Sequence, residues 1–358
     1  MAQFLSQIKR YPTRKDDTLQ GWDGADELIL EHLSDHDLIG KRVLIINDKF
    51  GALSCSLESF DCTTFTDSYI STMAIKLNSL GRINPFNDLK AIGGTYDYVI
   101  IQLPKNMSFF EDILCHLTHL LNKGAKVICG SMIKHMAPQS FELIHKYIGN
   151  TTTSLAKKKA RLIFSEFTKE RILSPYPLSV KMDGFNILFV HHSNLFSREK
   201  LDIGTRFFLE HIPKGKFKTI LDLGCGNGII GIKAKEINPQ AKILFSDESA
   251  MAVASAKANY TNYFQDDAEF IWLNCFEGEE KGTLDLVLCN PPFHQQHAIS
   301  DAVAWQMFQD AFKALKTHGI LRVIGNGHLG YPLKLKKIFG NSRIIATNPK
   351  FVIIEAVK

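Results

Sequence analysis

Short runs of apolar residues alternate along this chain with longer segments whose apolar residues recur every three or four positions. In the second half, segments 217–260, 268–278, 284–290 and 317–326 each contain an apolar run with the length of a buried strand, and helix-period stretches separate these runs. Such alternation predicts a parallel, doubly wound sheet. The last segment, 342–358, has the pattern of a hairpin, which predicts an antiparallel final strand.

The first half repeats this order of segments. Its strand-bearing segments resemble those of the second half in sequence: 42–57, 65–78, 96–105 and 149–167. The last of them matches 340–358 over its whole length without a gap. We interpret the pattern as an internal duplication. Chance similarity between two α/β domains is the alternative.

The duplication predicts two domains, and 358 residues exceed the usual size of a single one. We place the first domain at 1–174 and the second at 175–358, with the junction close to the proline-containing segment 174–179. The expected fold class is α/β. It consists of two tandem Rossmann-like domains, each with a doubly wound, mostly parallel sheet and an antiparallel last strand.

A glycine-rich turn joins the first strand of the second domain to the following helix. The sequence LDLGCGNG at 221–228 places Gly224, Gly226 and Gly228 where the backbone can turn tightly and approach a ligand at the helix N-terminus. Asp247 ends the next strand, where a carboxylate can accept hydrogen bonds from both hydroxyls of a ribose. A glycine turn without a ligand, and a helix N-cap at Asp247, are the alternatives.

Asn290-Pro291-Pro292-Phe293 ends a buried strand of the same domain. Neither proline can donate an N–H to a strand ladder, so the turn is either a simple strand exit or a holder for a planar amino group. The first domain ends the equivalent strand with the sequence QLPK at 102–105. Because the fold accepts another sequence at this place, the second interpretation is favoured.

The glycine-rich turn also differs between the two copies. Three positions change in the first domain, where Ile45, Asn47 and Lys49 correspond to Asp222, Gly224 and Gly226 of the second. Asn and Lys cannot replace glycines where the backbone must approach a ligand closely. The first domain is therefore expected to be structural or RNA-binding, and not catalytic.

Composition excludes several classes of protein. The net charge of +5 is mild and shared by both halves, so any nucleic-acid binding must come from local patches. The seven cysteines form no C-x-x-C pair and no zinc spacing, which favours reduced thiols in a cytoplasmic protein without a bound metal. No apolar run approaches 18 residues, so we expect neither secretion nor membrane insertion.

One local basic patch lies at 156–161, in the turn of the first domain's final hairpin. Lys157, Lys158 and Lys159 follow one another there, with Lys169 and further basic residues nearby. A solvated turn is the default interpretation of such a run. The alternative is a site that contacts RNA phosphates.

The glycine-rich turn, Asp247 and the Asn-Pro-Pro-Phe turn together resemble those of class I S-adenosylmethionine-dependent methyltransferases. More narrowly, 194–213, 290–308 and 333–358 are similar to the bacterial ribosomal RNA guanine-N2 methyltransferases, and nearest to the branch that modifies 23S RNA. In that family a degenerate first methyltransferase domain precedes an active one. The resemblance covers nearly the whole chain.

The resemblance implies S-adenosylmethionine as the cofactor and no metal. The residues expected to bind the cofactor lie at the ends of the first three strands of the second domain: Asp222, Gly224, Cys225, Gly226, Gly228, Asp247 and Asn274. Asn274 would contact the adenine, and a role in a turn is its alternative.

The family's reaction requires a guanine amine whose lone pair points at the methyl group. The Asn290 side-chain oxygen and the Pro291 carbonyl are expected to accept its two N–H groups, and Phe293 to stack on the base. Pro292 and His294 are expected to line the substrate site. Phe293 as a core residue, and His294 as a surface or capping residue, are the alternatives.

We therefore expect a cytoplasmic, monomeric 23S rRNA guanine-N2 methyltransferase. A 16S rRNA guanine-N2 methyltransferase is the alternative enzyme. A non-catalytic RNA-binding ribosome assembly factor is the alternative outside enzymes.

Overall fold

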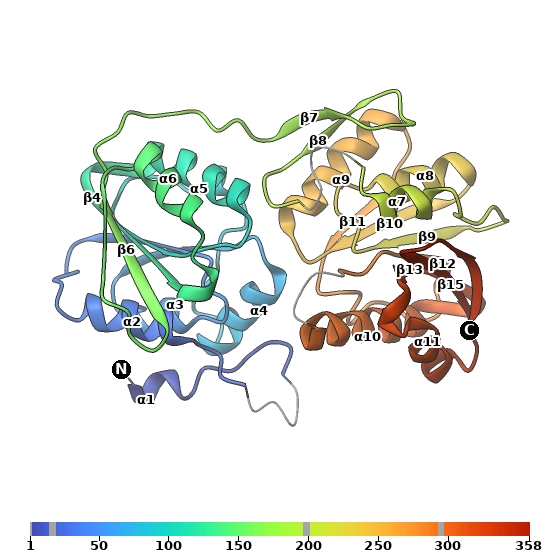
Figure 1. Ribbon diagram of the computed structural model, residues 1–358, viewed down its shortest axis with the longest axis horizontal. Helices are drawn as coiled ribbons and strands as arrows, with labels where there is room; N and C mark the ends of the chain where they lie inside the picture. The colour runs from blue at the N-terminus through green and yellow to red at the C-terminus, as the bar shows by residue number, and fades with distance from the viewer. Residues whose placement is uncertain (1, 14–18, 196–200, 293–296) are drawn as a thin grey trace. The chain divides into compact units, whose positions relative to one another are not determined.

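The computed structural model describes residues 2–13, 19–195, 201–292 and 297–358. The chain forms two compact units, Met1–Tyr176 and Pro177–Lys358 (Figure 1). Each unit contains its own sheet with helices packed on it. The predicted fold class, two tandem Rossmann-like domains, is confirmed.

The sheet of the N-terminal unit has the strand order β2-β1-β3-β4-β6-β5. Its strands are β1 (Arg42–Ile46), β2 (Asp61–Phe65), β3 (Tyr96–Gln102), β4 (Leu121–Met132), β5 (Thr151–Thr153) and β6 (Ala160–Glu166). The first four pair in parallel, whereas β6 pairs antiparallel with both β4 and β5. The antiparallel last strand agrees with the sequence prediction.

Helices connect these strands: α1 (Ala2–Leu5), α2 (Gly24–Leu33), α3 (Ala52–Ser56), α4 (Tyr69–Asn78), α5 (Met107–Leu120) and α6 (Pro138–Tyr147), with 3-10 turns at Leu89–Ala91 and Ile133–His135. α5 shows why they start where they do. The Asn106 side chain accepts hydrogen bonds from the N–H groups of Ser108 and Phe109 at 3.1 and 3.4 Å, and asparagine is one of the residues that favour this capping position.

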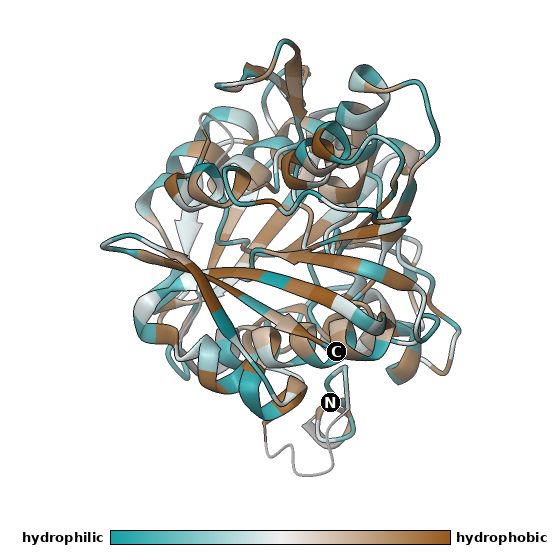
Figure 2. Cartoon of the chain, turned by 90° about the vertical axis from the view of Figure 1, so that its right-hand side faces the viewer, coloured by the Kyte–Doolittle hydropathy of each residue, from teal (hydrophilic) through white to brown (hydrophobic). Residues whose placement is uncertain are grey.

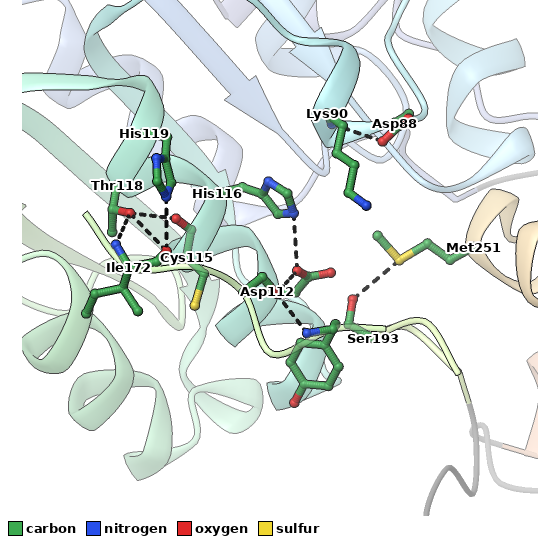
Figure 3. A network of polar contacts seen from close by, with 12 residues as sticks. Asp88, Lys90, Asp112, Cys115, His116, Thr118, His119, Ile172, Ser193 and Met251 are labelled. Atoms are coloured by element: carbon green, nitrogen blue, oxygen red, sulfur yellow. Dashed lines mark hydrogen bonds and ion pairs between the residues drawn. The ribbon is translucent and has the colours of Figure 1, made fainter. Parts of the chain in front are cut away.

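The last segment of the N-terminal unit forms hydrogen bonds with residues of α5 (Figure 3). The Ile172 N–H donates to Thr118 Oγ1 at 3.0 Å, and Ser174 Oγ donates to Asp112 Oδ1 at 2.5 Å. Tyr176 Oη donates to Glu111 Oε2 at 3.2 Å. The end of this unit is therefore an ordered part of its helical layer.

The sheet of the C-terminal unit has the order β11-β10-β9-β12-β13-β15-β14. Its strands are β9 (Thr219–Leu223), β10 (Lys242–Asp247), β11 (Glu269–Trp272), β12 (Leu284–Cys289), β13 (Leu315–Asn326), β14 (Arg343–Thr347) and β15 (Phe351–Val357). β15 is antiparallel to β13 and β14, and the other pairs are parallel. A separate hairpin of β7 (Leu178–Lys181) and β8 (Leu188–His191) precedes this sheet.

The helices of this unit are α7 (Ile203–Leu209), α8 (Ile229–Ile237), α9 (Ala250–Tyr263), α10 (His297–Ala314) and α11 (Tyr331–Phe339), with a 3-10 turn at Gly327–Leu329. Alternate strand residues bury on opposite faces. Ile220 and Leu286 belong to one core, and their neighbours Leu221 and Val287 to the other. Figure 2 shows the mostly hydrophobic strands between helices that carry both hydrophilic and hydrophobic residues.

The two sheets share one topology, position by position. Met132 pairs with Ala160 in the first sheet as Asn326 pairs with Phe351 in the second. These two pairs fall at matching places in the gapless alignment of 149–167 with 340–358. The first sheet differs at one edge, where a single parallel bridge between Phe65 and Phe86 stands in place of a strand like β11.

One detail of the predicted alignment is wrong. The similarity of the sequence FTD at 65–67 to FSD at 245–247 suggests that Asp67 is the counterpart of Asp247. However, the N–H of Asn47 donates to the Phe65 carbonyl as that of Gly224 donates to the Ser246 carbonyl. Thr66 is therefore the counterpart of Asp247, and the first unit has no acid at that position.

In the described part of the chain, no helix is long and apolar enough to cross a membrane. The described residues also form no group of three or more His, Cys, Asp or Glu side chains that could hold a metal ion.

Candidate active site

The glycine-rich turn of the C-terminal unit uses the backbone freedom that only glycine offers at low cost. Gly224, Gly226 and Gly228 have φ values of +75°, +53° and +81°, all in the left-handed region. A Cβ at Gly228 would lie 3.0 Å from the Ala256 Cα, so this glycine also allows α8 and α9 to pack closely. The turn leads directly into α8, with Gly228 as its N-cap residue.

Asp247 and the carbonyl beside it hold the turn from the end of β10. The N–H groups of Gly224 and Cys225 donate to the Ser246 carbonyl at 2.8 and 3.0 Å, and the Gly226 N–H donates to Asp247 Oδ2 at 2.9 Å. The N-cap of α9 is Ser249, whose side chain accepts from the Ala252 N–H. Asp247 therefore does not cap α9, and it faces the predicted cofactor turn.

Asp222 is fully buried at the base of the turn. Its Oδ2 accepts a hydrogen bond from the Gly231 N–H at 2.8 Å, while Oδ1 has no hydrogen-bond partner among the described residues. Burial, and to a lesser extent the charge of Asp247, raises the pKa of this carboxyl well above its ordinary value. A buried oxygen of this kind has an unused capacity to bond with a ligand.

Two other predicted cofactor residues have identified surroundings. Burial raises the pKa of the Cys225 thiol well above its ordinary value, so the neutral thiol packs in the core and is not a nucleophile. Asn274 is buried beyond the end of β11, where its Nδ2 donates to Glu277 Oε2 at 3.0 Å. Its assignment to the adenine stays a prediction.

Asn290 follows β12 directly and has one satisfied and one unsatisfied end. Its Nδ2 donates to Thr205 Oγ1 at 3.2 Å. Its Oδ1 is buried and has no partner within the described chain. Pro291 is buried and Pro292 is exposed. The predicted residues Phe293 and His294 lie outside the residues that the structure describes.

The sheet brings the glycine-rich turn and Asn290 together. β9 and β12 are parallel neighbours, and Leu223 pairs with Cys289 at their carboxyl ends. The strand order reverses between these two strands, because β10 and β11 continue on one side and β13 on the other. In open α/β sheets, ligands bind at such a switch point. Gly224 and Asn290 are far apart in the sequence. In the fold, each follows directly after the carboxyl end of one of these two neighbouring strands.

The equivalent place in the N-terminal unit is closed by its own side chains. Gln102 occupies the position of Asn290. Its Oε1 accepts from the Lys49 N–H at 3.3 Å, and its Nε2 donates to Asp26 Oδ1. Both ends of this amide are therefore occupied from within.

The glycine-rich turn of the second unit also has a self-satisfied counterpart in the first. The buried Asp48 accepts hydrogen bonds from the N–H groups of Gly51, Leu53 and Ser54 at 3.0, 3.1 and 2.7 Å. Ser54 corresponds to Gly231, the residue whose N–H bonds to Asp222 in the second unit. A carboxylate from the turn thus occupies the donors at the start of α3.

The structure adds residues that sequence analysis missed. Thr205 lies in the first turn of α7 and contacts Asn290, which is 85 positions away in the chain. Asn326 ends β13 with a buried Oδ1 that has no partner in the described structure. Because Ile324 belongs to the same core as Phe351, strand alternation directs Asn326 to the face that carries α7. Its counterpart in the first unit is the apolar Met132, and this difference is the one sequence signal that could have identified it.

The predicted RNA-contacting lysines are found in the turn between β5 and β6. Lys157 Nζ lies 2.5 Å from Glu31 Oε1, and Lys158 forms an ion pair with Glu27. Lys159 has no ion pair among the described residues. Two of the three positive charges are therefore balanced by acids of α2.

Comparisons with known proteins agree with this geometry. Residues 2–169 match the RLMG N-terminal domain, and residues 186–355 match the methyltransferase small domain. A solved structure of the 16S rRNA N2 methyltransferase RsmC of T. Thermophilus, in complex with AdoMet and guanosine, is 20% identical with a TM-score of 0.79. The alignment covers 94% of this chain and 92% of the RsmC chain.

Other solved structures align with about one unit. The precorrin-6y C5,15-methyltransferase of Geobacter metallireducens is 13% identical with a TM-score of 0.37, and covers 48% of this chain and 95% of its own. TYW2 of M. jannaschii, in complex with AdoMet, is 16% identical with a TM-score of 0.36, and covers 48% of this chain and 81% of its own.

The unsatisfied Asp222 oxygen, the open glycine-rich turn and Asp247 fit S-adenosylmethionine. Two side-chain oxygens set the C-terminal unit apart from its closed counterpart: Asp222 Oδ1 at the base of the turn and Asn290 Oδ1 at the strand end, neither of which has a partner among the described residues. The chain joins an RLMG N-terminal domain to a methyltransferase small domain, and it is a class I S-adenosylmethionine-dependent methyltransferase.

Proposed function

We propose that this chain methylates the exocyclic N2 amine of a guanine in ribosomal RNA. The observation that carries the proposal is the buried Asn290 Oδ1, an acceptor without a partner among the described residues at the end of β12. An amine with two N–H groups is a chemical complement of such an acceptor when a second acceptor lies beside it. The carbonyl of Pro291 is that second acceptor, and the proline ring restricts its backbone.

The chain's own residues act mainly by orientation. Asn290 Oδ1 and the Pro291 carbonyl each accept one N–H of the amine, which directs the nitrogen lone pair away from both acceptors. S-adenosylmethionine supplies an activated methyl group, so neither a metal nor a covalent enzyme intermediate is needed. As the N–C bond formed and the bond between the methyl group and the sulfonium sulfur broke, the nitrogen would become positively charged and would then lose one proton to water.

The cofactor residues have distinct proposed roles. Asp247 accepts hydrogen bonds from the ribose hydroxyls through a carboxylate that also holds the Gly226 N–H. The left-handed backbone at Gly224 and Gly226 allows close approach of the cofactor's methionine part. Asp222 contributes its unused oxygen. Phe293 remains the predicted stacking surface for the base.

We also propose which ribosomal RNA contains the target guanine. The similar RsmC protein is described as a 16S rRNA methyltransferase, and this favours 16S rRNA over the 23S RNA expected from the sequence. The 23S alternative rests on the similarity of 290–308 to the large-subunit branch.

One experiment separates these substrates. The protein is incubated with methyl-labelled S-adenosylmethionine and, separately, with naked 16S RNA, naked 23S RNA and both ribosomal subunits from cells that lack the enzyme. We expect label in N2-methylguanine of one RNA only. Label on adenine or on protein, or no label in any RNA, would exclude the proposed function, and the last result would leave a non-catalytic RNA-binding factor.

The N-terminal unit is proposed to bind RNA through Lys159 of the β5–β6 turn, which has no ion pair among the described residues. The absence of a spanning helix in the described chain and the free state of all seven cysteines support a cytoplasmic location. A monomer is the proposed state.

A further inference from the structure

We propose that Thr205 is a positioning residue that holds the Asn290 amide through its Nδ2, so that Oδ1 faces the target amine. The proposal rests on the proposed function and deepens it. It assigns a role to a residue of α7 that lies outside both the glycine-rich turn and the Asn-Pro-Pro turn.

Thr205 is held rigidly in the first turn of α7. Asp202 caps this helix, and its Oδ2 accepts hydrogen bonds from the N–H groups of Gly204 and Thr205 at 2.9 and 3.1 Å. A Cβ at Gly204 would lie 3.0 Å from a ring carbon of Phe351, so the turn is pressed against β15. Thr205 is only 9% exposed. Its hydroxyl therefore has little freedom to move away from Asn290.

The contact orients an otherwise symmetrical group. The two ends of a side-chain amide have nearly the same shape, so hydrogen bonds decide which end points where. Thr205 Oγ1 accepts from Asn290 Nδ2 at 3.2 Å, and this leaves Oδ1 as the open end. If the amide turned over, Nδ2 would face the N–H groups of the target amine. Two donors would then oppose each other, and the amine would lose its acceptor.

The N-terminal unit supports the assignment independently. Asp23 caps α2 as Asp202 caps α7, and the third residue after each cap faces the strand end. In the first unit that residue is Asp26, which accepts from Gln102 Nε2 as Thr205 accepts from Asn290 Nδ2. The fold therefore places an acceptor from this helix against the amide in both units. In the first unit the other end of the amide bonds to the Lys49 N–H, whereas in the second unit it has no partner among the described residues.

The test compares Thr205→Val with Thr205→Ser. Valine keeps the shape of threonine but removes the acceptor, whereas serine keeps the hydroxyl. We expect Thr205→Val to lower kcat by about 10- to 100-fold with little change in the KM for RNA. Thr205→Ser should stay close to the wild type. The Kd for S-adenosylmethionine, measured by calorimetry, should be the same for all three proteins.

A second readout does not depend on turnover. In 15N-labelled protein, the side-chain amide signals that disappear in Asn290→Ala are those of Asn290. We expect Thr205→Val to shift these signals and to accelerate their hydrogen exchange, and Thr205→Ser to do neither.

The outcomes are distinguishable. A wild-type kcat in Thr205→Val, an equal loss in valine and serine variants, or unchanged Asn290 signals would overturn the role of Thr205. Loss of cofactor affinity in Thr205→Val would also overturn it, because it would indicate a merely structural effect. If the wild type methylates no RNA but the Asn290 signals respond as expected, the proposed function fails and the orienting contact stands.

Discussion

Asn290 and Gln102 occupy equivalent places in the two sheets and differ in what satisfies them. Gln102 bonds at both ends within its own unit, whereas Asn290 bonds only through Nδ2 to Thr205 in the described structure. A buried acceptor without a partner is costly in a stable fold. We therefore expect a substrate group to bond to this oxygen.

The first prediction concerns this oxygen. Asn290→Ala should bind S-adenosylmethionine with wild-type affinity and lose at least about 100-fold in kcat, because one of two orienting acceptors is removed. Calorimetry and single-turnover methylation measure the two quantities. Gln102→Ala is the matched control in the other unit and should keep normal turnover. A near-normal rate in Asn290→Ala would refute the role given to this residue.

Asp26 carries a second prediction, on pH. Burial, followed by the nearby charges of Asp23 and Asp48, raises the pKa of Asp26 to about 8. The folded state therefore holds a proton that the unfolded chain loses near its ordinary pKa of 3.8. This contribution to stability is complete below that value and is lost as pH rises towards 8. The slope is at most about 1.4 kcal/mol per pH unit.

Asp26→Asn should flatten this dependence, because asparagine does not titrate. Trp22 is the tryptophan of the N-terminal unit, so 19F NMR of 5-fluorotryptophan protein during urea unfolding at pH 5, 7 and 9 reports on that unit. Asp35→Asn changes an exposed acid just beyond α2 and should keep the wild-type slope. Equal slopes in Asp26→Asn and the wild type would contradict the assignment.

Helices α8 and α9 approach each other closely at Gly228, the last glycine of the glycine-rich turn. Gly228 has φ +81°, and a Cβ there would lie 3.0 Å from the backbone of α9. Gly330 has φ +65°, but a Cβ added there would have no other atom within 4 Å. Both glycines avoid backbone strain, and only Gly228 also avoids a clash.

The third prediction separates these two costs. Gly330→Ala should lower the free energy of unfolding by about 1–2 kcal/mol through the left-handed backbone alone. Gly228→Ala should cost clearly more, because α8 or α9 must also shift. Urea unfolding followed by circular dichroism measures both variants. Equal losses would show that helix packing at Ala256 tolerates the added methyl group.

The chain contains two versions of the same fold. The candidate ligand site is open in the C-terminal unit, and side chains of the N-terminal unit fill the equivalent site there. In the closed unit, Asp48 occupies the N–H groups at the start of α3, and Thr66 stands where the open unit has Asp247. Larger side chains at Asn47 and Lys49 add to this closure. We expect each difference to weaken cofactor binding, because the first unit lacks the carboxylate of Asp247 and the glycines of positions 224 and 226.

The fourth prediction is a stoichiometry of one S-adenosylmethionine per chain. Calorimetry should give one site for the wild type and none for Gly224→Asn/Gly226→Lys, which copies the closed turn. The reverse exchange, Asn47→Gly/Lys49→Gly, should add no second site, because Asp48 remains in place. Binding of two molecules by the wild type would contradict the closure of the N-terminal unit.

Local patterns in the amino-acid sequence determined the fold class and the presence of two units, and they indicated the candidate site. Periodicity and the gapless similarity of the last segments indicated two α/β units with antiparallel final strands. Glycine spacing and the Asn-Pro-Pro turn indicated where the chemistry lies. These features could be recognised because each depends on residues close together in the chain, whose backbone preferences and hydrogen-bonding groups act locally.

Tertiary structure alone decided which distant groups satisfy one another. It brought Thr205 to Asn290, Asp26 to Gln102 and Asn326 to the same sheet face. It also showed that Thr66, and not Asp67, is the counterpart of Asp247, because strand register depends on pairing between strands. Whether a buried polar atom is satisfied depends on neighbours supplied by the whole fold, and this difference separates the open site from the closed one.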